Sequence, residues 1–439
     1  MPSRRAVIPS AARLMTSLRD IGYDLPSAVA DLIDNCIDAG ATTADVQVCR
    51  EGGWSFIRIS DNGHGMTERV LDEAMRYGSR RSYRGRELGK FGLGLKTASL
   101  SQCRRLTVAT KTTKRGSIRI RRWDLDHVRD HDEWELERLV PSECPWYLTQ
   151  PLEAGVGTVV LWDKLDRILA YSRPDGERAL RALDAMSESI AEHLSVVFHR
   201  FLAGETADRR RLSIVFNGEP LQPWDPYARR EPSTIALTEQ RLVVEHHGDS
   251  RTVRVQPYVL PSQPKFSSAA AHAHAAGPKK WNRQQGIYIY RGDRMIQSGG
   301  WNRVRTMDEH SKLARIALDI PAELEELFQI NVAKMRVVVP DELRPQLRAL
   351  VAGVVAKAQD AYRGRLELVS SADESVISDG PSDDGSDWSL GQLWPLLTEV
   401  IARELSDHPE LLDRVLVALA NARPTQHRAG VDADVTASG

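Results

Sequence analysis

Helical periodicity dominates the start of the chain. Apolar residues recur at intervals of three and four over residues 12–39, and the pattern is broken near Gly22 and Pro26, which predicts two helices. Further helices are expected over residues 68–77 and from about Leu93. Short apolar runs between turn residues predict strands at residues 44–49, 55–60, 106–110, 117–122 and 158–163. Because helices and strands do not alternate regularly, the pattern predicts an α+β layer sandwich with mixed strand order.

A second α/β unit is predicted further along the chain. A long helix over residues 180–202 leads to it, and its first strand is expected near Arg211. Its last helix is expected over residues 342–368. Residues 261–278 have low sequence complexity and predict a mobile loop. The H-x-H pair in this loop is either half of a metal site or a solvent-exposed feature without function (His272 and His274).

The C-terminal part has a different composition. Residues 371–388 are rich in Ser, Gly, Pro and Asp, have too little apolar surface to fold alone and predict a disordered linker. Residues 390–422 have the apolar spacing of an amphipathic helical hairpin. The apolar stripe of such a hairpin serves internal packing or dimerisation, or it receives a partner protein.

Composition limits the class of protein. The 439 residues suffice for two or three domains with their own cores. No stretch approaches the roughly 20 uncharged apolar residues that span a bilayer, and the N-terminus lacks the apolar core of a signal peptide. We therefore expect a cytoplasmic protein that does not enter a membrane. The cysteines are widely spaced and predict reduced thiols rather than a zinc site or a disulfide framework (Cys36, Cys49, Cys103 and Cys144).

The net charge of −1 excludes a protein that coats nucleic acid by bulk charge, but the charge is unevenly distributed. Residues 79–122 carry fourteen Lys or Arg against one acid, Glu87. In residues 118–121, apolar and basic positions alternate, so Arg119 and Arg121 are expected on one face of a strand. That face either follows the phosphates of DNA or is simply solvated.

The first chemical motif lies on the second predicted helix. Spacings of four and three residues place Asp31, Asn35 and Asp38 on one helical face. A carboxylate can orient or deprotonate water, and an amide oxygen is a ligand that Mg²⁺ tolerates beside phosphates. The alternative is a solvated acidic face on a surface helix.

Two glycine-rich strings follow. Residues 59–66 run from a strand end into a turn, where Gly63 and Gly65 allow close approach to a planar ligand and Asp61 can accept a hydrogen bond from a ring amine. Residues 89–99 place glycines directly before a helix, a pattern that offers backbone N–H groups to phosphates, with Lys96 as a point charge. Each string alone is a weak signal.

In this order and spacing, the three strings resemble the GHKL superfamily of ATP-binding domains, which includes gyrase, the heat-shock chaperones, histidine kinases and MutL. The motifs of that family are E-x-x-x-N, D-x-G-x-G and G-x-x-G-x-G, with a mobile ATP lid between the last two. The resemblance implies a GHKL two-layer α/β sandwich that binds ATP and Mg²⁺. Asn35 would hold Mg²⁺, Asp61 would bind the adenine amine, and Gly65 and Met66 would line the base.

The same resemblance implies the remaining nucleotide contacts. Gly92, Gly94 and Lys96 would cradle the phosphates, and Thr158 looks like the Thr of a fourth motif that joins the adenine hydrogen bonds. Ser79 lies where the lid of the family often contacts phosphate. The other expected nucleotide-binding residues belong to the same motifs: Asp38, Ala39, Gly63 and Leu93.

The resemblance extends beyond the ATP-binding motifs. Residues 328–340 are similar to the segment of MutL-like transducer domains whose lysine, here Lys334, reaches the γ-phosphate. Histidine kinases lack such a domain, so the MutL, chaperone and Microrchidia (MORC) branch is favoured, and the strings DLIDNCIDAGA and YRGDRMI look most like bacterial MORC-like ATPases. The expected organisation is a GHKL domain over 1–205, a transducer-like domain over 206–369, an acidic linker over 370–388, a helical hairpin over 389–425 and a tail over 426–439.

One position departs from the family pattern. The catalytic Glu of the family is Asp31 here, and moving a general base by about 1 Å can cost on the order of 100-fold in rate. Two alternatives follow. Asp31 still activates water, or the protein binds ATP tightly and hydrolyses it slowly as a switch. We expect slow but real hydrolysis, with Asp31 and Lys334 as the catalytic residues.

The resemblance implies an ATPase that acts as an ATP-gated clamp. Two protomers would close through their N-terminal regions into a homodimer, and DNA would bind through the basic lid together with Arg119 and Arg121. Two alternatives remain: a chaperone-like or scaffold ATPase whose protein partner binds the C-terminal helices, and a protein kinase that uses the same ATP fold. The biological process does not follow from the sequence.

Overall fold

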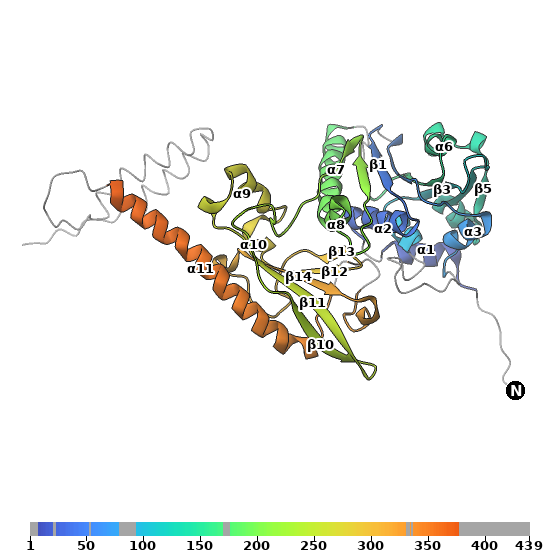
Figure 1. The fold of residues 1–439 in the computed structure, drawn as a ribbon. Helices are drawn as coiled ribbons and strands as arrows, with labels where there is room; N and C mark the ends of the chain where they lie inside the picture. The colour runs from blue at the N-terminus through green and yellow to red at the C-terminus, as the bar shows by residue number, and fades with distance from the viewer. Residues whose placement is uncertain are drawn as a thin grey trace, which may run out of the picture. The chain divides into compact units, whose positions relative to one another are not determined.

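The computed structural model describes residues 8–20, 23–51, 54–78, 94–169, 176–330, 334 and 337–376, and for residues 365–376 only the backbone is considered. Within this part, the chain forms two mixed β-sheets covered by helices (Figure 1). The α+β fold class expected from the sequence is confirmed. The hairpin expected over residues 389–425 and the tail after it lie outside the described residues.

The first sheet has the strand order β5-β4-β3-β6-β2-β1-β7-β8. Its neighbouring strands are antiparallel except for β1 and β7, which run parallel. The strands are β1 (Thr43–Cys49), β2 (Phe56–Asp61), β3 (Arg105–Lys111), β4 (Arg119–Asp124), β5 (Glu137–Leu139), β6 (Gly157–Asp163), β7 (Ser213–Phe216) and β8 (Glu219–Pro220).

Helices cover both faces of this sheet, and the central strand β6 shows why. Its side chains alternate between two cores: Val160 and Trp162 pack in the larger one, whereas Val159 and Leu161 pack in a smaller one with Leu148. The larger core includes α2 and α7, and the smaller one is closed by α6. The helices are α1 (Ala11–Arg19), α2 (Leu25–Asp38), α3 (Glu68–Met75), α4 (Gly94–Leu100), α5 (Leu125–His131), α6 (Trp146–Glu153), α7 (Glu177–Val197) and α8 (His199–Ala203).

Helix α2 has well-defined ends, which fix the position of the first motif. The Asp24 carboxylate accepts a hydrogen bond from the Ser27 N–H at 2.8 Å, and Pro26 lies in the first turn. At the other end, Gly40 has φ +69° and the N–H of Ala41 donates to the carbonyl of Cys36. This is a Schellman arrangement, which needs a residue that tolerates the left-handed conformation. The helix therefore ends directly after Asp38 and Ala39.

The second sheet has the order β10-β11-β14-β12-β13, and β9 pairs with β11. Its strands are β9 (Ile235–Ala236), β10 (Gln240–His246), β11 (Asp249–Val259), β12 (Gly286–Arg291), β13 (Arg294–Gln297) and β14 (Ala314–Ile320). One face packs against the long helix α11 (Arg344–Val376) through residues such as Val255, Ile289 and Val351. None of the described helices is long and apolar enough to cross a membrane.

Three expectations about the second unit are wrong. The strand near Arg211, which is β7, pairs with β1 and thus belongs to the first sheet. The predicted mobile loop contains α9 (Ala269–Ala275) and is followed by α10 (Lys280–Gln284), because its Ala-rich run forms a helix that Ser268 caps. In α9, His272 stacks on Trp281. Finally, α11 continues to Val376, into the predicted linker.

The other face of the second sheet packs on α7 and α8. Tyr290 of β12 shares a core with Val196 of α7, and its hydroxyl lies 2.9 Å from Nε2 of His199. Arg200 lies over the Tyr290 ring and pairs with Asp319 of β14. Strand β13 also contacts α7. The beginning of β13 is thereby held close to α7, which itself packs against α2.

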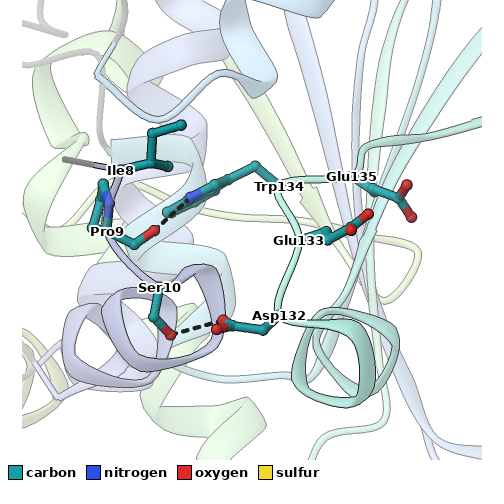
Figure 2. Close-up of a pocket in the computed structure, with 7 residues that line it drawn as sticks. All are labelled: Ile8, Pro9, Ser10, Asp132, Glu133, Trp134 and Glu135. Carbon is teal, nitrogen blue, oxygen red and sulfur yellow. Dashed lines mark hydrogen bonds between the residues drawn. The ribbon is translucent and has the colours of Figure 1, made fainter. Parts of the chain in front are cut away.

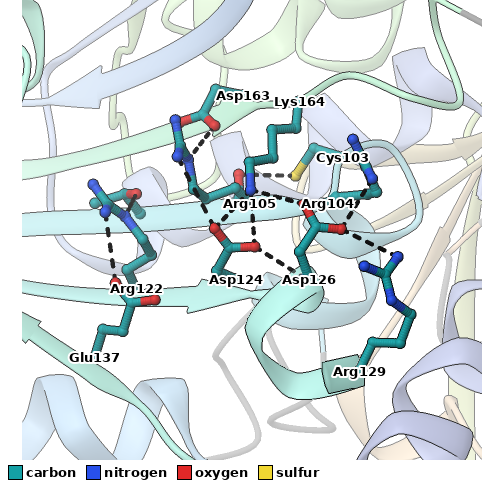
Figure 3. Close-up of polar contacts among 11 residues, drawn as sticks. Cys103, Arg104, Arg105, Arg122, Asp124, Asp126, Arg129, Glu137, Asp163 and Lys164 are labelled. Atoms are coloured by element: carbon teal, nitrogen blue, oxygen red, sulfur yellow. Dashed lines mark hydrogen bonds and ion pairs between the residues drawn. The ribbon is translucent and has the colours of Figure 1, made fainter. Parts of the chain in front are cut away.

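Most described cations of the basic segment have a carboxylate or a backbone carbonyl as partner. Figure 3 shows Arg104 paired with Asp126, and Arg105 with Asp163, while Arg122 lies near Glu137. Lys111 is buried and donates to the carbonyl of Leu152 at 2.8 Å. Among the described residues of this segment, the cations without a carboxylate or carbonyl partner are Lys114, Arg115 and Arg119. The lid cations expected at residues 80, 81, 84 and 86 lie outside the described residues.

The prediction that Arg121 lines a solvent-exposed DNA-binding face is wrong. Its side chain is only 3% exposed, because α3 covers this face of β4. The guanidinium donates to Asp72 at 2.6 Å and to Glu68 at 2.9 Å. Alternation in the sequence correctly places Arg119 and Arg121 on one face, but it does not reveal which faces of a strand are covered.

A surface cavity of about 590 Å³ lies at the described N-terminus (Figure 2). Residues 8–10 form one wall and residues 132–135 the other. The two walls are joined by hydrogen bonds from the Ser10 hydroxyl to Asp132 at 2.7 Å and from the Trp134 indole N–H to the carbonyl of Pro9 at 3.2 Å. None of the nucleotide-site residues expected from the sequence lines this cavity.

Replacing Arg121 by Ala should destabilise the protein by about 2 kcal/mol, because the variant leaves two carboxylates without their shared buried cation. The matched control is Arg119→Ala on the same strand, which should change the free energy of unfolding by no more than about 0.5 kcal/mol. Urea unfolding of the two variants measures the difference. Equal stabilities would contradict the structural role of Arg121.

Candidate functional site

Helix α2 carries the first motif as one continuous face. Asp31 is buried, whereas Asn35 and Asp38, one and two turns later, are exposed. At a rise of 1.5 Å per residue, Asp31 and Asp38 lie about 10 Å apart along the helix axis. The motif therefore has a buried end at Asp31 and an open end near Ala39.

At the open end, Asp61 lies at the end of β2. The Gly63 N–H donates to its carboxylate at 2.8 Å, and interactions with the Thr158 backbone and the Cys36 thiol also favour its ionised form. Burial nevertheless raises the pKa of Asp61 to about 6, because desolvation outweighs these bonds. A carboxylate in this state is a strong acceptor that favours a donor such as a ring amine.

The glycines around Asp61 are required by close backbone contacts. Gly157 has φ +141°, and a Cβ there would lie 1.9 Å from the carbonyl oxygen of Asp61. Gly65 has φ +65°, and its Cβ would lie 2.3 Å from the carbonyl oxygen of Lys111. A Cβ on Gly63 would meet the carbonyl oxygen of Ala39 at 2.7 Å. Any larger residue would move the turn away from β6 or from α2.

Thr110 connects the turn to β6. Its hydroxyl accepts from the Met66 N–H at 2.8 Å, donates to the carbonyl of Gly157 at 2.9 Å and lies 3.2 Å from the Thr158 hydroxyl. Thr110 thereby links Met66 to Gly157 and Thr158, and Thr158 pairs with Asp61 across β6 and β2. Thr110 was not identified from the sequence, because a Thr in the middle of a strand has no signal of its own.

At the buried end of α2, both oxygens of the Asp31 carboxylate are occupied. Oδ1 accepts from the Lys334 ammonium at 2.8 Å, and Oδ2 accepts from the Tyr23 hydroxyl at 3.0 Å. Burial and the charge of Asp31 raise the pKa of Tyr23 far above its ordinary value, so the phenol stays a donor. A Cβ on Gly94, the first residue of α4, would lie 2.8 Å from Oδ2 of Asp31.

Lys334 also contacts a second carboxylate. Its ammonium lies 2.6 Å from Oδ2 of Asp34, whose Oδ1 accepts from Nε of Arg294 at 2.9 Å. The exposed fractions are 4% for Asp31, 0% for Asp34, 2% for Arg294 and 8% for Lys334. Two anions and two cations therefore form a neutral cluster closed to water, with both anions on α2 and both cations from beyond residue 290.

No role for Asp34 or Arg294 was predicted from the sequence. Asp34 lies 60° around the helix from Asp31, so the expected i, i+4 and i+7 face did not include it. Arg294 follows a tight turn in YRGDRMI, where a basic residue usually indicates solvent exposure. The available signal was that Asp34 directly follows the apolar residues Leu32 and Ile33 of α2.

Lys96 makes a contact other than the one expected. Its side chain is buried, and the ammonium donates to the carbonyl of Ala74 in α3 at 2.7 Å. Burial lowers the pKa of Lys96 to about 8. Its phosphate contact stays a prediction, and so do those of Ser79, Gly92 and Leu93, which lie outside the described residues.

The donor set suits a metal held mainly by phosphates. Among the described residues, no group of three or more His, Cys, Asp or Glu is arranged to hold a metal ion. Asn35 and Asp38 are exposed on the α2 face. Because Mg²⁺ commonly binds one or two protein oxygens together with water and substrate phosphates, Asn35 fits the expected ligand.

Comparison with known proteins agrees with this geometry. Residues 23–158 match the family model described as "Histidine kinase-, DNA gyrase B-, and HSP90-like ATPase". For this part of the chain, the match confirms the GHKL-type ATPase domain expected from the motifs. The matched range contains the three motifs and ends at Thr158, but not Arg294 or Lys334.

Partial similarity also extends to DNA mismatch repair protein MutL from several bacteria. The chain is 41% identical to the Gemmatimonas aurantiaca protein over 64 residues, which are 15% of this chain and 10% of that protein. It is 39% identical to the Agathobacter rectalis protein over 93 residues (20% and 14%) and 32% identical to the Colwellia psychrerythraea protein over 111 residues (24% and 17%). The matches thus span less than a fifth of each of these relatives.

The raised pKa of Asp61 predicts a pH-dependent cost to stability. Because the pKa is about 6 in the folded chain and 3.8 ordinarily, the folded state binds the proton more tightly and loses stability as pH rises between these values. Asp61→Asn cannot titrate, so its stability relative to the wild type should rise by up to about 3 kcal/mol from pH 4 to pH 7.5. Urea unfolding at several pH values measures this, and a pH-independent difference would contradict the assigned pKa.

Proposed function

We propose that the protein binds Mg-ATP along α2 and hydrolyses it slowly, and that hydrolysis controls a clamp formed by two protomers. The observation that carries this proposal is the contact between Lys334 and Asp31. It joins a lysine far along the chain to the carboxylate in the position of the general base. Nucleotide chemistry at α2 is thereby coupled to the second sheet unit.

Each end of α2 has its own role in this proposal. At the open end, Asp61 accepts the adenine amine and Thr158 supports it, while the turn from Gly63 to Met66 encloses the base with Asp38 and Ala39. At the buried end, Asp31 takes a proton from the attacking water. Asn35 would hold Mg²⁺ between the two ends, and the ion would neutralise phosphate charge. Gly94 lies beside Asp31, where the phosphate-binding residues are expected.

The occupied carboxylate of Asp31 supports slow turnover. Both carboxylate oxygens already accept hydrogen bonds from Lys334 and Tyr23, so an attacking water has no free oxygen to donate to. Lys334 must release Oδ1 before Asp31 can accept a proton from water. The γ-phosphate is the expected new partner of the ammonium, so the same movement frees the base and senses the nucleotide.

The clamp part of the proposal rests on the second sheet unit and on the strings that resemble bacterial MORC-like ATPases. An ATP-dependent homodimer fits a chain in which a distant lysine senses ATP. DNA is the proposed substrate, since the matched relatives are named for DNA mismatch repair. Because Arg121 is buried, it is not available to DNA. Among the described residues of the basic segment, the proposed DNA contacts are Lys114, Arg115 and Arg119, and the proposed lid would add to them.

Asp31→Asn should lower kcat for ATP hydrolysis by about 100-fold or more, since a general base contributes a factor of about 10² to 10⁴. Binding of a non-hydrolysable ATP analogue should change by less than about threefold, because Asp31 lies at the catalytic end. The control is Asp61→Ala, which should abolish analogue binding. γ-Labelled ATP reports free phosphate for a hydrolase and labelled protein for a kinase. Undiminished hydrolysis by Asp31→Asn would refute its catalytic role.

The non-hydrolysable ATP analogue should convert the protein from monomer to dimer in sizing experiments, and Lys334→Ala should weaken this response. Duplex DNA should bind the dimer with an affinity that falls steeply with salt, because counterions are released from phosphates. A nucleotide-independent monomer would contradict the clamp. Dimerisation without any DNA binding would favour the alternative in which the clamp acts on a protein partner.

A further inference from the structure

Asp34 is the best-enclosed charged group of the cluster at the buried end of α2. Its side chain is completely shielded from solvent, and its two oxygens contact two different cations. Arg294 Nε lies 2.9 Å from Oδ1, and Lys334 Nζ lies 2.6 Å from Oδ2. A buried carboxylate is stable only when both its charge and its lone pairs are satisfied, and these two contacts achieve that.

Asp31 and Asp34 share Lys334, but they are not equivalent partners. Asp31 must release the ammonium to act as a base, and its Oδ2 would keep the Tyr23 hydroxyl. Asp34 has no comparable task, since it lies deeper than Asp31 and is bound to Arg294 from β13. When Lys334 leaves Asp31, Asp34 can therefore keep its own bond to the ammonium.

We propose that Asp34 is a positioning residue for hydrolysis: it holds Lys334 beside the base while Asp31 exchanges the ammonium for water. Arg294 donates to Asp34 and fixes the orientation of its carboxylate. This inference rests on the proposed function. It adds a second acid and a second cation to the site, neither of which contacts the substrate.

Arg294 is necessary for this arrangement because of charge balance. If Lys334 were the only cation beside Asp31 and Asp34, the cluster would carry an uncompensated buried negative charge, which is costly. Arg294 is 2% exposed and supplies the second positive charge. Asp34 can then hold a cation while Asp31 stays available as a base.

The test compares three variants with the wild type. Asp34→Asn removes the negative charge of Asp34 and leaves the Arg294 guanidinium without its carboxylate partner. The double variant Asp34→Asn with Arg294→Gln restores charge balance, so its melting temperature should recover most of the loss. Asp319→Asn is the matched control, because Asp319 pairs with Arg200 at the same junction but lies outside the cluster.

If Asp34 positions Lys334, the melting temperature and kcat of the variants should not recover together. We expect kcat of both Asp34 variants to fall at least tenfold, while the affinity for a non-hydrolysable ATP analogue changes less than threefold and Asp319→Asn keeps wild-type kcat. A purely structural role predicts that the double variant regains kcat together with its melting temperature. Recovery of kcat to within twofold of the wild type would overturn the proposal.

A second readout does not depend on hydrolysis. Without nucleotide, the buried Lys334 should react slowly with acetic anhydride, and Asp34→Asn should raise its acetylation rate at least fivefold relative to the exposed Lys114, as measured by mass spectrometry. An unchanged rate in Asp34→Asn would show that Asp34 does not hold Lys334. If the wild type released no phosphate, the proposed function would fail, while the acetylation rates would still decide this inference.

Discussion

The ammonium of Lys334, shared between the carboxylates of Asp31 and Asp34, is the interaction on which the rest of the site depends. Burying an ion without a partner costs several kcal/mol, so each charge in the cluster makes the others necessary. The two acids come from one helix, and the two cations come from distant parts of the chain. The second sheet unit thus supplies both cations that pair with the two acids of α2.

Helix α2 separates two environments that suit different chemistry. At its open end, the Asp61 carboxylate is a hydrogen-bond acceptor, and desolvation raises its pKa to about 6. Burying this carboxylate costs stability, and it is buried where a donor from a ligand is expected. At its buried end, both oxygens of Asp31 are occupied by Lys334 and Tyr23. In the proposed function, the site accepts a nucleotide at one end and rearranges ion pairs at the other, so the release of Lys334 would limit turnover.

The sequence predicted much of this fold, because periodicity reports burial directly. The helices that became α2 and α7, the strands β1, β2, β3 and β6, and the glycine turns around Asp61 agree with the expected elements. The misses have a common physical origin. The burial of Arg121, the pairing of β7 with β1 and the contacts of Asp34 with Arg294 are all set by residues far away in the chain. Local patterns show which residues share a face, but tertiary packing decides what covers it.

The most direct test of the central claim is a crystal structure with Mg²⁺ and a non-hydrolysable ATP analogue. The account predicts that the Lys334 ammonium contacts the terminal phosphate, has left Oδ1 of Asp31 and remains within hydrogen-bonding distance of Asp34. A structure in which the analogue is bound and Lys334 still bridges both carboxylates would contradict this account, as would one in which Lys334 has lost Asp34.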